Sequence, residues 1–166
     1  MSTLRYSLVL LFSIISFSSF SQNSIVNIYN PNADAKADIA AAVKKAKAEN
    51  KHVLLQIGGN WCPWCVKMHK LFESDSTINK ALHSNYVFVM VNYSKENKNL
   101  PLLKELEFPQ RFGFPSLVVL NQEGKRIHTQ ATGLLESGDG YDHEKIKDFL
   151  KSWTVKALDP ASYPEK

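Results

Sequence analysis

Hydrophobic and polar positions along the chain predict a fold in which strands alternate with helices. Residues 52–57 and 86–93 are short runs rich in apolar and β-branched side chains, which is typical of buried strands. Residues 116–132 contain two more runs around a turn at 122–124 and predict a hairpin. An alternating pattern at 24–29 predicts a short first strand.

Segments with helical spacing of apolar residues separate these strands. The segment 32–50 predicts an amphipathic helix with Asn32 or Asp34 as its cap. Shorter pieces follow at 74–84, irregular or helical, and at 99–106, helical, so the predicted order is β-α-β-α-β-α-β-β-α. Two helices have clear apolar faces: one from Pro63, with Cys65, Met68 and Phe72, and one capped by Asp142, with Ile146, Phe149, Leu150 and Trp153.

The first 21 residues have the pattern of a secretory signal peptide. Arg5 precedes an apolar run at 8–20, and the small residues Ser19 and Ser21 stand before the expected cleavage site. The run is shorter than the roughly 20 residues that a membrane span needs, so a cleaved leader is expected and an uncleaved anchor is the alternative. The mature protein is therefore expected to be periplasmic or secreted.

The remaining chain has the length of one domain. Residues 22–158 are expected to form this domain and 159–166 a flexible tail. The formal net charge is +4 with acidic and basic residues interspersed, which argues against a nucleic-acid partner. The two cysteines are too close in sequence to staple distant parts of the chain. We expect one monomeric domain stabilised by its hydrophobic core.

The cysteines stand in the stretch GGNWCPWC, residues 58–65. The stretch follows a predicted strand and opens a predicted helix, with Pro63 in the first turn, where helices tolerate proline. Free backbone N–H groups and the helix dipole at this end favour a negative charge on Cys62. Cys65 lies one turn further along on the core side. We therefore expect Cys62 to be the reactive thiolate and Cys65 to be the resolving thiol.

Other uses of the cysteine pair stay open at this point. Cys62, Cys65 and His69 could supply three of the four ligands of a zinc site, but no second Cys/His pair completes it. An inert structural disulfide is the other alternative, although so short a loop would stabilise the chain only weakly. Covalent haem is excluded, because Val66 rather than histidine follows the second cysteine.

From about residue 25 to residue 153 the chain resembles the thioredoxin superfamily. The resemblance implies an α/β thioredoxin fold, a central mixed β-sheet flanked by helices with the CxxC motif at the N-terminus of a helix. The motifs that carry it are VLLQIGGNWCPWC, GFPS before a strand, the hairpin LVVLNQEGKRI, and TGLL around Gly133.

The same resemblance implies the residues that would hold a substrate. Pro115 would be a cis-proline facing the disulfide, and Phe114 would offer its backbone to a substrate segment as an added strand. Trp61, Pro63 and Trp64 would contact the substrate beside the thiol, with Trp61 also partly packed in the core and Trp64 directed to the surface.

One position departs from the thioredoxin pattern. Thioredoxin carries a buried aspartate six residues before the first cysteine, which relays the proton of the resolving thiol, and here Gln56 stands in that place. Glutamine cannot titrate. Deprotonation of Cys65 would then need water or a neighbour such as Glu73 or His69.

These observations predict a thiol:disulfide oxidoreductase that uses a redox-active Cys62/Cys65 disulfide on cysteine-containing secreted proteins. A membrane or periplasmic redox partner would recharge it, and no organic cofactor or metal is expected. The alternative is a redox-inactive module of the same fold that binds peptides or a metal.

Overall fold

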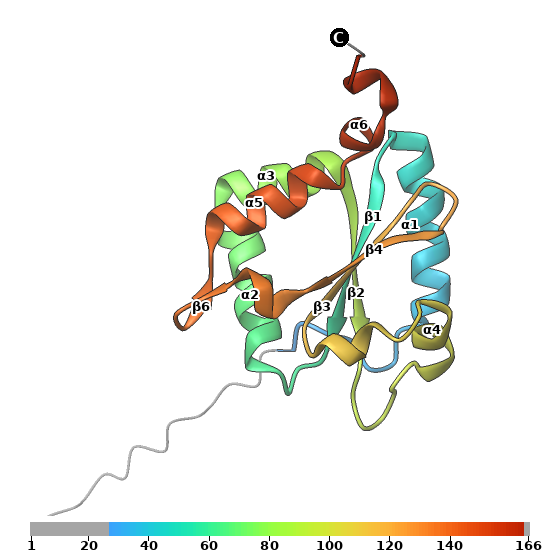
Figure 1. Cartoon of the computed structure of the whole chain (residues 1–166). Helices are drawn as coiled ribbons and strands as arrows, with labels where there is room; N and C mark the ends of the chain where they lie inside the picture. The colour runs from blue at the N-terminus through green and yellow to red at the C-terminus, as the bar shows by residue number, and fades with distance from the viewer. Residues whose placement is uncertain (1–26, 165–166) are drawn as a thin grey trace, which may run out of the picture.

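The computed structural model describes residues 27–164. Its main helices and strands are arranged around one central sheet (Figure 1). In chain order they are α1 Ala35–Glu49, β1 His52–Gly58, α2 Pro63–Ser74, α3 Ser76–Asn85, β2 Tyr86–Asn92, α4 Leu100–Glu105, β3 Ser116–Leu120, β4 Arg126–Ala131, β5 Glu136–Ser137, β6 Gly140–Tyr141, α5 His143–Ser152 and α6 Val155–Leu158.

The central sheet has the strand order β2-β1-β3-β4. β1 runs parallel to β2, with His52 beside Tyr86, and antiparallel to β3, with Ile57 beside Ser116. β3 and β4 form the antiparallel hairpin that the sequence predicts. The sheet is therefore mixed and flanked by helices, which confirms the predicted fold class.

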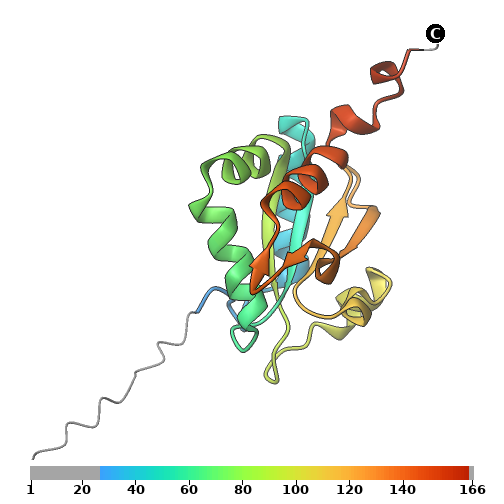
Figure 2. The ribbon, with the colours of Figure 1, turned by 60° about the vertical axis from the view of Figure 1, so that its left-hand side comes forward.

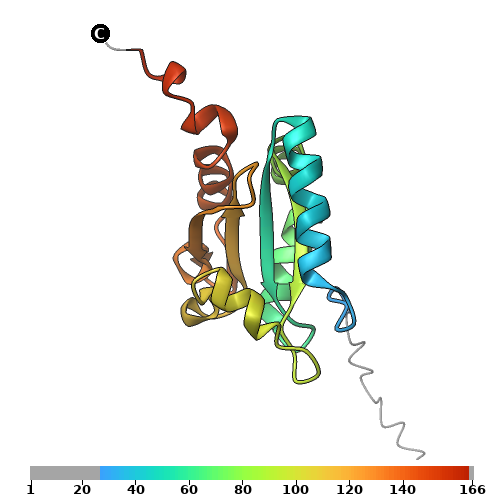
Figure 3. The same ribbon diagram turned by 90° about the vertical axis from the view of Figure 1, so that its right-hand side faces the viewer.

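Helices cover the two faces of the sheet in two groups. α1 and α4 pack on one face, and α2, α3 and α5 pack on the other (Figures 1 and 3); Figure 2 turns the second face toward the viewer. Along β1, Val53 and Leu55 belong to the α1 cluster, whereas Leu54 belongs to the α2 cluster. Because side chains alternate along a strand, Gln56 shares the α2 face with Leu54, behind the cysteines.

Aspartate side chains begin three of the helices. Asp34 accepts hydrogen bonds from the backbone N–H groups of Lys36 and Ala37, and this decides between the two caps predicted for α1. Asp75 caps α3 and Asp142 caps α5 in the same way. Each carboxylate satisfies N–H groups that have no partner inside the helix.

The prediction of a first strand at 24–29 is wrong for the part that the structure describes. Residues 27–29 form no strand, and the backbone N–H groups of Ile28 and Tyr29 instead donate to the side chain of Asn60. Residues 24–26 lie outside the described part, as does the predicted signal peptide at 1–21. An alternating pattern is compatible with any extended segment that has one buried face. Here the Asn60 side chain accepts the backbone hydrogen bonds that a neighbouring strand would otherwise accept.

Two other elements also differ from the predictions. β2 lies at the edge of the sheet, so its middle residues are half-buried rather than buried as expected. The two-residue strands β5 and β6 form a small hairpin that no hydrophobic pattern indicated. In the predicted tail the structure describes a short 3₁₀ turn at Pro160–Ser162, and the flexibility of that tail remains a prediction.

Within residues 27–164, no helix is both long enough and apolar enough to cross a bilayer.

Candidate active site

The site forms where β1 ends and α2 begins. β1 ends at Gly58, and Gly58 O accepts a hydrogen bond from the backbone N–H of Tyr93 at 2.5 Å. The turn that follows leads to Cys62, the N-cap residue of α2, and Pro63 occupies the first turn as predicted. The cysteine pair is therefore held between the central strand and the N-terminus of a helix.

Cys62 and Cys65 form a disulfide. Cys65 is fully buried and 4% of Cys62 is exposed, so Cys62 alone retains contact with solvent. The backbone N–H of Cys65 donates to Cys62 Sγ over 3.1 Å. This donor at the helix N-terminus would stabilise a thiolate on Cys62 after reduction.

The peptide bond between Phe114 and Pro115 is cis, which confirms the predicted cis-proline. Phe114 packs against the cluster that contains both cysteines. The Phe114 ring also meets the Trp61 ring edge-on, with centroids 5.4 Å apart, and lies 4.7 Å from the Tyr93 ring. The loop before β3 thus lies beside the disulfide, as the resemblance implied.

The two tryptophans differ from the expectation. Trp61 is 54% exposed, so the predicted partial packing in the core is wrong. Its indole instead lies over Phe114 and donates from Nε1 to Tyr93 O at 2.7 Å. Trp64 is half-buried against Tyr141, with Lys67 above its ring, so its predicted surface position holds only in part. The exposed Pro63 lies between them.

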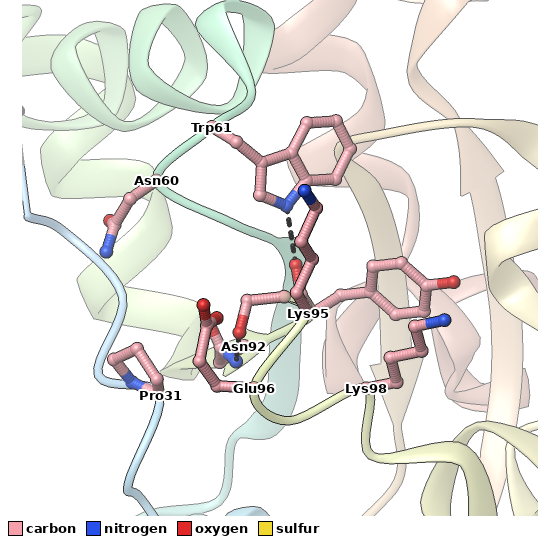
Figure 4. A pocket seen from close by; sticks show the side chains of 9 residues that line it. Pro31, Asn60, Trp61, Asn92, Lys95, Glu96 and Lys98 are labelled. Carbon is pink, nitrogen blue, oxygen red and sulfur yellow. Dashed lines mark hydrogen bonds between the residues drawn. The ribbon is translucent and has the colours of Figure 1, made fainter.

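A pocket of about 580 Å³ opens on the Trp61 side of the site (Figure 4). Asn60 and Trp61 line it from the loop before α2, and Tyr93, Lys95 and Glu96 line it from the segment after β2. The hydrogen bond from Trp61 to Tyr93 O, dashed in Figure 4, holds the indole at the edge of this pocket.

Gln56 lies directly behind the disulfide, in a fully buried position. Its Nε2 donates to the Tyr29 hydroxyl at 2.8 Å and to Cys65 O at 3.1 Å. Burial raises the pKa of Tyr29, and the hydrogen bond from Gln56 lowers it by a smaller amount. The compartment around Cys65 therefore contains neutral polar groups where thioredoxin has an acid.

Sequence reasoning missed Tyr29 and Asn60. Asn60 Oδ1 accepts from the backbone N–H groups of Ile28 and Tyr29, each at 2.9 Å, and Asn60 Nδ2 donates to Tyr29 O. These bonds hold the Tyr29 ring in one buried cluster with both cysteines. The only local signal was the position of Asn60 inside the GGNWC stretch, and nothing linked it to a residue about thirty positions earlier.

His69 and Glu73, the two residues that the sequence suggested for deprotonating Cys65, interact with each other. His69 Nε2 lies 3.2 Å from Glu73 Oε1, and the Glu73 side chain is 67% exposed. In the described part of the chain, no group of three His, Cys, Asp or Glu side chains is placed to hold a metal ion. Cys62, Cys65 and His69 therefore do not form the three-ligand set of the zinc alternative.

Comparison with known proteins agrees with this geometry. The sequence profile of the thioredoxin-like domain matches residues 39–142, which is more than half of the chain. The chain belongs to the thioredoxin-like domain family. Its relatives in this family include the disulfide bond reductase DsbH of Chlamydia pneumoniae, 28% identical over 68% of this chain and 70% of the relative. The thiol:disulfide interchange protein DsbD of Colwellia psychrerythraea is 26% identical over 66% of this chain, but the match spans only 18% of DsbD.

Solved structures show the same thioredoxin-like fold. A disulphide isomerase from Xylella fastidiosa superposes with a TM-score of 0.68 at 26% identity, over 76% of this chain and 95% of that one. The oxidised C-terminal domain of DsbD from Neisseria meningitidis has a TM-score of 0.55 at 22% identity, over 72% and 96% of the two chains. The similarity to the DsbD domain concerns the fold alone. The thioredoxin-like chain is therefore a member of a family of thiol:disulfide oxidoreductases, with its CxxC pair in place.

Proposed function

We propose that this protein exchanges its Cys62–Cys65 disulfide with cysteines of proteins outside the cytosol. The observation that carries the proposal is the disulfide at the N-terminus of α2, in which Cys62 Sγ accepts the N–H of Cys65. The cis-proline loop and the exposed Trp61 beside it support contact with an extended substrate.

The reaction proceeds through a mixed disulfide. In the reduced protein the Cys62 thiolate attacks a substrate disulfide, one substrate sulfur leaves as a thiolate, and a Cys62–substrate bond forms. Cys65 then attacks Cys62 Sγ, which releases the second substrate thiolate and closes the Cys62–Cys65 bond. The two cysteines lose two electrons in total, and their two protons end on the substrate thiols.

We place the net reaction in the reducing direction. The chlamydial relative is named as a disulfide bond reductase, and its match covers two thirds of both chains. Under this proposal a membrane or periplasmic partner returns electrons to the pair. Equilibration with glutathione buffers should give a reduction potential nearer to about −270 mV than to about −120 mV, the values typical of a reductant and of a disulfide donor. A reduction potential near about −120 mV would instead indicate that the protein donates disulfides, and it would not contradict the exchange reaction itself.

The experiment that tests the exchange reaction is reduction of insulin by dithiothreitol with the protein as catalyst. Wild type should accelerate the precipitation of insulin, and variants Cys62→Ser and Cys65→Ser should not. Equal rates with wild type and with the double Cys→Ser variant would favour the alternative, a redox-inactive module that binds peptides. Stoichiometric zinc in the purified protein would favour a metal-binding module.

A further inference from the structure

Two buried polar groups near the disulfide leave part of their hydrogen-bonding capacity unused in the described structure. They are the side-chain oxygen of Gln56, an acceptor, and the hydroxyl hydrogen of Tyr29, a donor. Gln56 is fully buried, and its Oε1 has no hydrogen-bond partner within residues 27–164. Both N–H groups of its amide are used, one on the Tyr29 hydroxyl and one on Cys65 O. This orientation of the amide is fixed by Cys65 O, because a carbonyl oxygen can only accept.

The Tyr29 hydroxyl therefore accepts from Gln56 and keeps its own hydrogen free. Among residues 27–164 this hydroxyl makes no other hydrogen bond. Tyr29 is 3% exposed, so water does not readily supply an acceptor. A free O–H in such a dry place is costly unless some state of the protein provides a partner.

Gly58 shows that this hydroxyl and the sulfur of Cys65 lie near each other. A Cβ at Gly58 would collide with Cys65 Sγ and would lie 2.8 Å from the Tyr29 hydroxyl oxygen. The sulfur and the hydroxyl thus both border the space that a side chain at position 58 would occupy. In the disulfide, sulfur is a poor acceptor, whereas a thiolate is a strong one.

We propose that the Tyr29 hydroxyl, oriented by Gln56, donates a hydrogen bond to the sulfur of Cys65 in the reduced protein and stabilises the Cys65 thiolate that resolves the mixed disulfide. The inference rests on the proposed exchange reaction and adds a role that neither cysteine can perform. Tyr29 takes up no proton: the thiol proton passes to solvent and ends on the released substrate thiol.

The ionisation of Tyr29 suits this role. Burial raises its pKa, so the hydroxyl keeps its hydrogen throughout the working pH range and remains a donor. Other titratable groups on or against α2 are Tyr141, whose hydroxyl donates to Trp64 O at 3.3 Å, the His69–Glu73 pair, and the exposed Lys67 and Lys70. Tyr29 is the member of this set that shares a buried cluster with both cysteines.

The test uses Cys62→Ser protein, in which Cys65 is the sole thiol, and follows its alkylation by iodoacetamide as a function of pH. Adding Tyr29→Phe should move the profile to higher pH and lower the alkylation rate near neutral pH about 10-fold, since a hydrogen bond to a charged group is lost. Tyr86→Phe is the matched control: Tyr86 is also buried, and its hydroxyl donates to Leu150 O at 2.7 Å, away from the cysteines. An identical profile with and without Tyr29→Phe would overturn the inference.

Two further measurements keep the test decisive. If Tyr29→Phe does not fold, Gln56→Met removes the group that orients the hydroxyl and should move the profile in the same direction. In Cys65→Ala protein, Tyr29→Phe should leave the rate of mixed-disulfide formation by Cys62 unchanged. Failure of Cys62 to form any mixed disulfide would contradict the proposed function. Normal formation of mixed disulfides together with an unchanged pH profile of Cys65 alkylation would contradict only the role of Tyr29.

Discussion

The backbone N–H of Cys65 donates to Cys62 Sγ across 3.1 Å, so after reduction the buried cysteine would help to stabilise a thiolate on its more exposed partner. Cys62 receives this donor at the N-terminus of α2, where the helix dipole acts in the same direction. Cys65 receives no such donor from the helix and lies fully buried. This asymmetry supports the proposal that Cys62 attacks and leaves and that Cys65 resolves the mixed disulfide.

Replacing Trp61 by alanine should slow the reaction with protein substrates and leave the reaction with small disulfides nearly unchanged. Trp61 is exposed beside Phe114 and can cover a substrate segment, and loss of an aromatic anchor costs about 1–2 kcal/mol, or roughly 5- to 30-fold. We expect kcat/KM for insulin to fall by this factor while the rate with oxidised glutathione changes less than about 2-fold. Tyr163→Ala, at another exposed aromatic, is the control. Equal losses for both substrates would contradict a role in substrate contact.

Replacing Gly58 by alanine should destabilise the fold. The added Cβ would meet Cys65 Sγ and the Tyr29 side chain, both of which are buried. Overpacking of this kind costs about 1–3 kcal/mol, measured as the free energy of unfolding in urea. Gly133→Ala has nothing within 4 Å of the added atom and should change that free energy by less than about 0.5 kcal/mol. Equal effects of the two substitutions would show that the contact at Gly58 carries no strain.

Asn60→Ala should release the segment that holds Tyr29. The backbone N–H groups of Ile28 and Tyr29 both donate to the Asn60 side chain. Hydrogen exchange of these two amides should accelerate by about 10-fold or more, because their acceptor is lost. Asn79→Ala also removes a hydrogen bond between a side chain and the backbone, at Phe72 O, and should leave these two amides protected. Unchanged exchange in Asn60→Ala would mean that other contacts hold the segment.

His128 should make stability depend on pH. Burial lowers its pKa from the usual value near 6.5, so the unfolded chain binds the proton more readily than the folded one. Stability should therefore be retained above about pH 6.5 and be lost as the pH falls toward 5. His128→Phe preserves the stacking on Trp153 and removes the titration. Urea unfolding at pH 7.5, 6 and 5 should show a larger loss in wild type than in the variant, and a constant difference between them would contradict the assignment.

The parts of the site that lie close together in sequence could be predicted without the structure. Helical spacing placed Cys65 on the core side of α2, and the position of Pro63 marked the first turn. The cis bond before Pro115 followed from a family resemblance rather than from the local pattern. Short-range rules suffice for these features because each depends on neighbours within a few residues.

The polar compartment behind the disulfide could not be predicted in this way. Gln56 was recognised as a departure from the thioredoxin pattern, but its partner Tyr29 lies 27 positions earlier and is held by side-chain bonds to Asn60. Such a contact depends on how distant segments meet, and no periodicity encodes it. For the same reason the exposure of Trp61, which is set by Phe114 and Tyr93, was misjudged.

The most direct test of the central claim is capture of the mixed disulfide. Reduced Cys65→Ala protein should form a covalent adduct with insulin that persists on a non-reducing gel and disappears with dithiothreitol, because Cys62 can attack and no resolving thiol remains. Reduced Cys62→Ala protein, in which only the buried Cys65 is left, should form at least 10-fold less adduct. Adducts of both variants in equal amounts, or of neither, would contradict the assignment of Cys62 as the attacking thiolate.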